Sequence, residues 1–331
     1  MTNQITNKRI NKSAAAAIFV GGLLTLSPQT ANAQGGVVDS PQNAQQVALL
    51  HWYQAASSVE FPVQNRPTAL AFDGEHIWVA NSFSNTLTEL QASTGAPLAT
   101  IATGFSPSGV VFDGANIWVT EFGNNQVLKL RARDGAVQGS FLTGNGPVGI
   151  AFDGANIWVT NTFANSVTRL RASDGANLGT FPVGSDPLFV IFDGANIWVA
   201  NHGSNNVTKL RASDGFHLGT FAVENLPTAL AFDGANIWVT NESSNTVSKL
   251  RASDGATLGT FAAGIVPNGV AFDGANIWIA NNRNSGTVTK LQASNGANLG
   301  TFAVGSFPFA VAFDGAHIWV ANGVSNTVSK L

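Results

Sequence analysis

Short apolar runs of five or six residues follow one another along most of this chain, separated by turns rich in Gly, Asp, Asn and Ser. One stretch shows the pattern clearly, with runs at 227–232, 237–240, 246–250 and 258–262. β-Branched and aromatic residues fill these runs, and apolar residues show no sustained helical spacing. Asp-Gly, which tolerates the positive φ of tight hairpins, separates several of them. We therefore expect four short antiparallel strands here.

The same pattern recurs seven times. Each copy contains Phe-Asp-Gly followed by Ile-Trp, and its Phe stands at Phe72, Phe112, Phe152, Phe192, Phe232, Phe272 or Phe313. The step is about 40 residues, a period typical of propellers, solenoids and arrays. Four antiparallel strands repeated seven times predict an all-β fold, a seven-bladed β-propeller. A β-solenoid is the alternative, but its coils are usually shorter and lack four evenly spaced hairpins.

The last copy stops at Leu331 after its third strand. A match to the missing fourth strand stands before the first copy, because Ser-Val-Glu-Phe-Pro-Val at 58–63 resembles Leu-Gly-Thr-Phe-Pro-Val at 178–183. We expect this N-terminal strand to complete the last blade. Closing the ring in this way removes exposed sheet edges.

The residues before that strand follow a different pattern. A basic start, an apolar run over 14–26 and Ala-Asn-Ala at 31–33 predict a signal peptide over 1–33, and hence a protein exported to the periplasm or the extracellular space. Residues 34–57 are predicted to be a linker with a short helix, since Ser40-Pro41 is a helix start signal. The propeller is then expected over 58–331.

The composition excludes several kinds of chemistry and ligand. The chain has no cysteine, which excludes disulfides and a thiol nucleophile. Charged residues make up 11% and the formal net charge is −3, so clusters of Lys and Arg for nucleic acid or anionic membrane are missing. We expect a monomer without a transmembrane anchor once the signal is cleaved, and no cofactor.

The residues that recur in every copy have structural explanations. Phe72, Trp78 and their counterparts are expected to pack between adjacent blades. The Asp-Gly turns lack the alternating carboxylates of a calcium loop. The recurring Asn81 is expected to bond loop backbone. The basic residues of the third strands are expected to form a solvated outer rim; they are Lys129, Arg169, Lys209, Lys249, Lys290 and Lys330.

The repeat resembles two known types. Trp-Val-Thr-Asn at the end of the second strand, as at 238–241, stands where the Tyr-Val-Thr-Asn (YVTN) β-propeller repeat has its name motif. Trp-Val-Thr-Glu at 118–121 is similar to the repeat of virginiamycin B lyase, which has Leu-Trp-Phe-Thr-Glu at that point. The first resemblance implies an exported or surface-located propeller. The second implies a metal-assisted His/Glu site on one face that opens a cyclic lactone by elimination, although the lyase's catalytic set does not map onto this chain residue by residue.

Function is expected on the face where the blades differ. The loops that lead into the first strand and those that follow the second strand vary between copies, whereas the Asp-Gly turns on the opposite face barely change. The candidate catalytic residues there are Glu121, His202 and Glu242. Candidate ligand-binding residues on the same face are Arg66, Phe122, Asp186, Glu224 and Arg283. A His with two or three carboxylates could hold Mg²⁺ or Ca²⁺ and act as acid or base. The alternative is that these scattered charges only keep the face soluble.

Three functions stay open on the sequence alone. The favoured one is an exported module that binds a protein, peptide or glycan on its variable loops. The second is a metal-dependent lyase or lactonase of the virginiamycin B lyase type, using Mg²⁺ or Ca²⁺. The third is a structural protein of the cell envelope surface.

Overall fold

The computed structural model of the protein describes residues 16–20, 23–27 and 58–331. The first two ranges form an antiparallel pair, β1 (Ala16–Val20) and β2 (Leu23–Ser27). The cleavage pattern at 31–33 and the helix predicted within 34–57 lie outside the described residues, so signal peptide and helix stay predictions. In the described part of the chain, no helix is long and apolar enough to cross a membrane.

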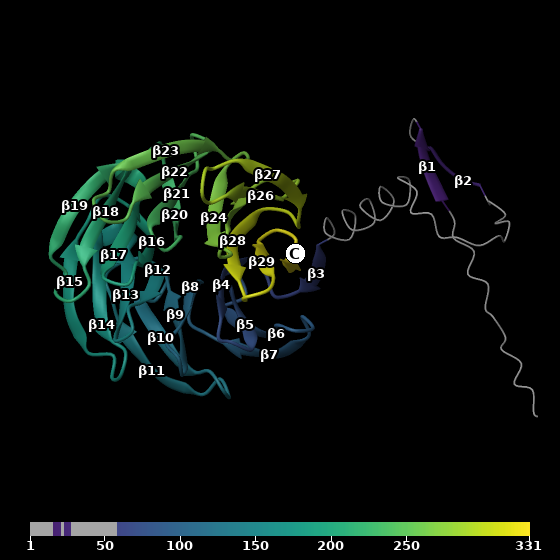
Figure 1. Ribbon diagram of the computed structural model, residues 1–331. Coiled ribbons are helices and arrows are strands. Elements are labelled where there is room, and N and C mark those ends of the chain that lie inside the picture. Colours follow the sequence, from purple (N-terminus) through teal and green to yellow (C-terminus); the bar gives the residue numbers. More distant parts are fainter. Residues whose placement is uncertain (1–15, 21–22, 28–57) are drawn as a thin grey trace, which may run out of the picture. The chain divides into compact units, whose positions relative to one another are not determined.

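Residues 58–331 form seven antiparallel four-stranded sheets arranged as the blades of a ring, which confirms the predicted β-propeller (Figure 1). The innermost strands surround the centre and begin at the recurring proline. They are β4 (Pro67–Phe72), β8 (Pro107–Phe112), β12 (Pro147–Phe152), β16 (Pro187–Phe192), β20 (Pro227–Phe232), β24 (Pro267–Phe272) and β28 (Pro308–Phe313). Blades 1 to 7 are numbered in this order.

The second strands contain the Ile-Trp pair and are buried along nearly their whole length. They are β5 (His76–Asn81), β9 (Asn116–Glu121), β13 (Asn156–Asn161), β17 (Asn196–Asn201), β21 (Asn236–Asn241), β25 (Asn276–Asn281) and β29 (Ile318–Asn322). The third strands follow them, after the 3₁₀ turns η1 (Thr162–Ala164) and η2 (His202–Ser204) in blades 3 and 4. They are β6 (Thr86–Gln91), β10 (Gln126–Arg131), β14 (Ser166–Arg171), β18 (Asn206–Arg211), β22 (Thr246–Arg251), β26 (Thr287–Gln292) and β30 (Thr327–Lys330).

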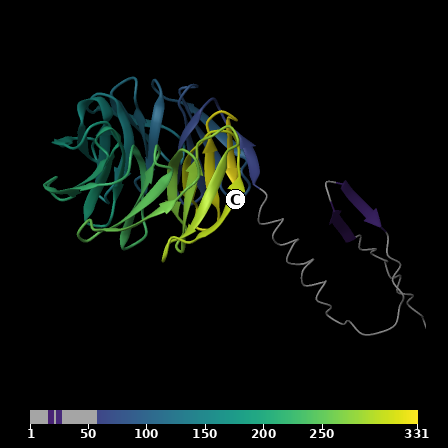
Figure 2. The ribbon, with the colours of Figure 1, turned by 90° about the horizontal axis from the view of Figure 1, so that it is seen from above.

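The fourth strands form the outside of the ring and are the most exposed. They are β7 (Pro97–Ala102), β11 (Val137–Leu142), β15 (Asn177–Pro182), β19 (His217–Ala222), β23 (Thr257–Ala262), β27 (Asn298–Ala303) and, in blade 7, β3 (Val59–Pro62). Strand β3 pairs with β30 in the register Val59↔Lys330 to Pro62↔Thr327. Chain segments from both ends of the propeller sequence thus share one sheet. Figure 2 shows the loops gathered at the two edges of the ring.

Aromatic residues fill the space between blades. Trp78 is fully buried and packs against residues of blade 2, including Val110 and Ile117. Phe72 is partly buried against Trp319 of blade 7. Burial of large rings contributes the most apolar area per residue, so these contacts dominate the cohesion of the ring. The prediction that Phe72, Trp78 and their counterparts pack between blades is confirmed.

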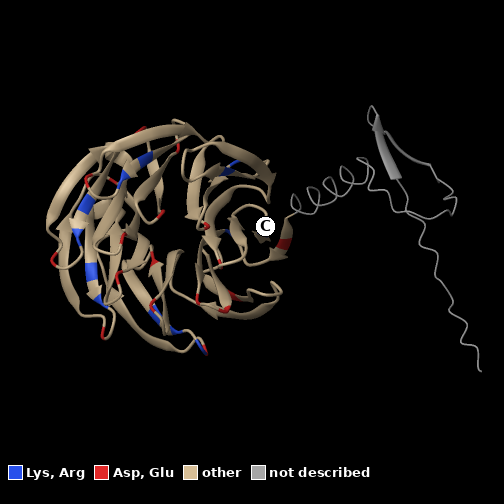
Figure 3. Ribbon diagram, in the orientation of Figure 1, with Lys and Arg blue, Asp and Glu red and all other residues tan. Residues whose placement is uncertain are grey.

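The prediction of a solvated rim of basic residues is wrong. Lys129 is 8% exposed, and its ammonium lies over the Trp118 ring and donates to the backbone carbonyl of Ala172 in the next blade at 2.7 Å. Lys209, Lys249, Lys330 and Arg169 reach the equivalent carbonyl of their own next blade. Figure 3 shows basic residues on these third strands. The position of the third strand towards the outside of each blade suggested a solvated rim, but a long stem lets the charge reach back to a neighbouring backbone.

A second recurring residue also joins the blades. Asn85 adopts a left-handed backbone, and its side-chain oxygen accepts a hydrogen bond from the Ser106 N–H of the next blade at 2.9 Å. Five further asparagines repeat this bond: Asn125, Asn165, Asn205, Asn245 and Asn326. Gly286 stands at this position in blade 6, where the repeat is one residue longer, and there Phe307 N–H donates to the Arg283 carbonyl instead.

Candidate functional site

The variable loops meet on one face of the ring. This face is formed by two sets of loops, and we call it the variable face. One set leads into the innermost strands (residues 63–66 in blade 1), and the other connects the second and third strands (residues 82–85 in blade 1). The two sets are joined by hydrogen bonds, as from Ser82 N–H to the Arg66 carbonyl at 2.9 Å. On the opposite face Ala92 N–H donates to the Glu75 carbonyl, which joins the two sets of nearly invariant turns.

A cavity of about 300 Å³ lies among the innermost strands. Its wall is mostly apolar and includes Leu188, Phe189 and Phe309, while Thr228, Asn268 and Glu242 supply polar atoms. Ligand sites in proteins are typically apolar hollows of this size with a few polar groups. The position directly after the recurring proline differs in most blades and lines this cavity: Thr68, Ser108, Val148, Leu188, Thr228, Asn268 and Phe309.

Two of the three candidate catalytic residues come together beside this cavity. His202 is the first residue of η2 in blade 4, and Glu242 follows β21 in blade 5. His202 Nε2 lies 3.5 Å from Glu242 Oε2, and both side chains are about one-third exposed or less. His202 and Glu242 occupy equivalent positions in the loops of two neighbouring blades, so the pair bridges these blades.

Glu121 does not join them. It ends β9 in blade 2 and is 1% exposed. Its Oε1 accepts a hydrogen bond from Gly104 N–H, and its Oε2 accepts one from the Gln126 side-chain amide, each at 2.6 Å. These bonds hold the carboxylate inside the blade, where it stabilises the leading loop. In other blades an asparagine occupies this place, and at Asn161 its oxygen accepts from Gly144 N–H in the same way. The predicted bond from the recurring asparagine to loop backbone is therefore formed at Asn161, whereas the Asn81 side-chain oxygen has no partner and its amide nitrogen donates to the strand carbonyls of Val79 and Thr86.

Aromatic side chains are exposed on three consecutive blades of the variable face. Phe83, Phe105 and Phe163 are each more than three-fifths exposed. Phe122 is half-buried and packs edge-on against Phe163, with ring centres 5.5 Å apart. The sequence singled out Phe122 and missed the other three, although a Phe among the small and polar residues of a turn loop is itself an unusual signal.

The remaining candidate residues lie on the variable face but do not gather into a single site. Asp186 and Glu224 are exposed, and Asp186 contributes its backbone carbonyl to His202 N–H. Arg283 is exposed in blade 6 and lines a second hollow with Glu242 and Phe309. Arg66 is half-buried between the rings of Phe83 and Phe309. Glu242 and Arg283 therefore share a hollow, whereas Asp186 and Glu224 contact neither.

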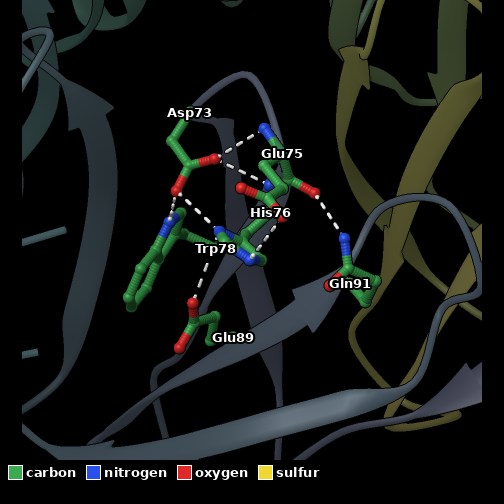
Figure 4. Close-up of polar contacts among 6 residues, drawn as sticks. All are labelled: Asp73, Glu75, His76, Trp78, Glu89 and Gln91. Carbon is green, nitrogen blue, oxygen red and sulfur yellow. Dashed lines mark hydrogen bonds and ion pairs between the residues drawn. The ribbon is translucent and has the colours of Figure 1, made fainter. Parts of the chain in front are cut away.

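A cluster on the opposite face sets blade 1 apart from the others. There Glu89 replaces the basic residue of the third strand, and His76 replaces the turn asparagine (Figure 4). His76 Nδ1 lies 3.2 Å from Asp73 Oδ2 and 3.5 Å from Glu89 Oε1. Burial raises the pKa of Glu89 above its usual value. Asp73 is held by Trp78 and by backbone N–H groups, so this cluster maintains the turn and presents no open coordination position.

Comparison with known proteins supports the fold. No family model and no curated protein matches this chain. Among solved structures, a streptogramin B lyase matches with a TM-score of 0.71 and 18% sequence identity, covering 83% of this chain and 96% of that chain. The hydrazine synthase of Kuenenia stuttgartiensis matches with a TM-score of 0.70 and 18% identity, covering 80% of this chain and 95% of that one. Both likenesses are to the propeller architecture.

The residues present do not fit the metal site that a lyase would imply. Within residues 58–331, no group of three or more His, Asp or Glu side chains is arranged so that it could hold a metal ion. His202 and Glu242 form a pair, and Glu121, the third candidate, has both oxygens occupied within blade 2. A stable site for Mg²⁺ or Ca²⁺ needs more oxygen ligands than this pair supplies.

Proposed function

We propose that the protein is an exported binding module whose variable face captures a protein, peptide or glycan at the mouth of the central cavity. One observation carries the proposal. Several side chains at which the seven copies depart from their own pattern gather in one region: Glu242 and Phe309 line both the central cavity and the second hollow, Arg283 lines the second hollow, and His202 pairs with Glu242. A ring of seven equal blades would be stable without these differences, whereas binding of an asymmetric ligand requires different residues in different blades.

The chemistry of the mouth suits a ligand with apolar and polar parts. Phe189 and Phe309 offer rings for stacking or apolar contact, Asn268 offers an amide, and Glu242 offers a carboxylate that accepts hydrogen bonds or pairs with a cation. Burial of the ligand's apolar part would supply the affinity, and the polar groups would select its orientation.

The proposal is tested by screening the full exported protein against a peptide display library and a glycan array. Any ligand found is then measured by calorimetry with two variants. Glu242→Gln combined with Phe309→Leu should weaken binding at least tenfold. His317→Asn is the matched control, because it restores the consensus residue in a turn of the opposite face and should leave binding unchanged. Equal loss in both variants, or binding unaffected by the double substitution, would argue against the variable face.

Export is a separate part of the proposal and rests on the basic and apolar pattern of residues 1–33. Its test is N-terminal sequencing of the protein recovered outside the cytoplasm, which should begin at Gln34. Recovery of an uncleaved chain in the cytoplasm would contradict it.

A second candidate function is a lyase or lactonase. The observation that favours it is the His202–Glu242 pair beside a cavity, which places a nitrogen base next to a carboxylate. Here Glu242 would orient the imidazole and His202 would accept a proton from the substrate. Incubation with a cyclic depsipeptide should then give a linear product with wild type and none with His202→Ala. Absence of turnover with wild type would exclude this substrate class.

A further inference from the structure

Arg66 lies in an aromatic hollow between blades 7 and 1. Its guanidinium carbon stands 4.5 Å from the centre of the Phe83 ring and 5.4 Å from that of Phe309. The hollow measures about 460 Å³, and Phe307, Val324 and the amides of Asn65 and Asn326 complete its wall. Two rings beside one guanidinium restrict its orientation.

The backbone of Arg66 is fixed on both sides. Its N–H donates to the Asn326 side-chain oxygen at 2.9 Å, and its carbonyl accepts from Ser82 N–H at 2.9 Å. Its φ is +56°, a left-handed conformation that non-glycine residues seldom adopt. Bonds from two blades therefore hold the arginine in place before any ligand arrives, which lowers the entropy lost on binding.

The guanidinium of Arg66 has no acidic partner. Arg131, Arg171 and Arg251 each pair with the aspartate three residues further on. Within residues 58–331, no carboxylate lies within ion-pair distance of Arg66, and no side-chain hydrogen bond from its guanidinium is formed. An arginine whose faces lie against aromatic rings still presents N–H groups along its edge. Those donors are directed to whatever occupies the hollow.

We propose that this hollow binds the carboxylate of a ligand whose neighbouring group is apolar or aromatic. A guanidinium edge matches a carboxylate with two parallel hydrogen bonds. The walls contribute rings and an aliphatic side chain but no second cation, so one positive charge is matched by one negative charge. A phosphate dianion would leave charge uncompensated in this hollow. The C-terminus of a peptide that ends in an apolar residue has the required chemistry.

The test uses small probes and the full protein. N-acetyl-L-phenylalanine carries the carboxylate, N-acetyl-L-phenylalanine amide is its neutral counterpart, and phenyl phosphate is the dianionic alternative. Binding is measured by ligand-observed NMR titration, since a fragment of this size is expected to bind in roughly the millimolar range. The acid should bind wild type at least tenfold more tightly than the amide. Equal binding of acid and amide, or tighter binding of phenyl phosphate, would overturn the assignment.

Variants locate the site. Arg66→Gln should abolish the preference for the acid, and Arg66→Lys should retain only part of it because an ammonium lacks the planar fork. Phe83→Leu should weaken binding of both probes while keeping the preference. The matched control is Arg133→Gln, which removes one exposed positive charge from the opposite face. Circular dichroism and thermal melting confirm that each variant is folded. If Arg66→Gln and Arg133→Gln bind the acid equally well, the inference fails.

This inference rests on the proposed function for its premise that the variable face meets a ligand, but the two can fail separately. A ligand from the peptide or glycan screen that needs Glu242 and Phe309, and binds Arg66→Gln as well as wild type, would overturn the carboxylate site and leave the binding function standing. If binding of the acid depends on Arg66 while the ligands from the screen bind Glu242→Gln as well as wild type, the carboxylate site is supported and the cavity mouth is contradicted.

Discussion

The indole N–H of Trp198 donates a hydrogen bond of 2.7 Å to the carboxylate of Asp193. The other oxygen of Asp193 accepts from the backbone N–H groups of Ala195 and Asn196, which closes the Asp-Gly turn. The same bond between turn aspartate and tryptophan recurs in the other six blades, from Trp78 to Asp73 through Trp319 to Asp314. The two motifs that recur most clearly in the sequence are thus one structural unit, in which a buried tryptophan gains a partner for its N–H and the aspartate fixes the turn.

Substitution of this aspartate should destabilise the blade. Asp193→Ala leaves the Trp198 N–H and two backbone N–H groups without their acceptor, at a cost of roughly 1–3 kcal/mol for each buried group that water cannot reach. Urea unfolding should show a lower midpoint for Asp193→Ala than for wild type. Asp174→Ala, in an exposed turn of the third hairpin, is the control and should have a much smaller effect.

The stability of the propeller should fall over a narrow range of acidic pH. Burial by itself would raise the pKa of Asp73, Asp113, Asp193, Asp233, Asp273 and Asp314, but hydrogen bonds from the tryptophan and from turn N–H groups outweigh it and hold each pKa below its usual value. A carboxylate with a lowered folded-state pKa stabilises the fold above its unfolded pKa of about 3.9 and loses that contribution as pH falls through the folded value.

Thermal melting between pH 7 and pH 2 checks this expectation. The melting temperature should change little down to about pH 5 and fall steeply below about pH 4 as several aspartates take up protons together. Asp193→Asn, which cannot titrate at this position, should show a shallower fall than wild type. A melting temperature independent of pH down to pH 2 would contradict this account of the turns.

Blade 1 should become more stable when Glu89 is replaced by lysine. In five blades a third-strand Lys or Arg donates to a carbonyl of the next blade, whereas Glu89, at the equivalent position in blade 1, carries no ammonium or guanidinium that could donate in this way. Burial raises the pKa of Glu89, and an acid whose pKa is higher in the folded state destabilises the fold once pH exceeds that value. We expect Glu89→Lys with His76→Asn to gain about 1 kcal/mol in urea unfolding at pH 7. The reverse change, Lys129→Glu, should destabilise blade 2, and a gain there would contradict the role of the bridge.

Removal of the first propeller strand should open the ring. Strand β3 supplies the fourth strand of blade 7, and Phe61 packs on Trp319 with ring centres 5.7 Å apart. Deletion of residues 58–63 exposes β30 and this ring, so the melting temperature should drop by many degrees and the protein should aggregate. Phe61→Ala keeps the backbone pairing and removes only the ring, so its loss should be smaller, up to about 3 kcal/mol. A deletion variant that melts like wild type would exclude a role for closure in stability.

The architecture was predictable because it depends on local patterns repeated seven times. Phe-Asp-Gly and Ile-Trp recur at a nearly fixed step, and Pro marks the start of each innermost strand. A repeat that cannot bury its apolar face alone must stack on its neighbours, so period and strand pattern together restrict the fold to a ring or a stack. The same reasoning predicted burial of Phe72 and Trp78 between blades.

The sequence could not determine which groups the long or polar side chains contact in the folded protein. Lys129 stands on a third strand, whose place towards the outside of the blade predicted exposure, yet it reaches a carbonyl 43 residues further along the chain. Glu121 breaks the repeat and so suggested chemistry, but its two hydrogen bonds bury it inside a blade. Both outcomes depend on atoms of other segments, which no local pattern specifies.

The sequence by itself therefore determined the blade count, the strand order and the face on which the blades differ, because each follows from spacing within a single repeat. Only the tertiary structure decided which of the differing residues act together. His202 meets Glu242, 40 residues further along the chain, and Arg66 of blade 1 meets Phe309 of blade 7, because the curvature of the ring brings loops of neighbouring blades to one place.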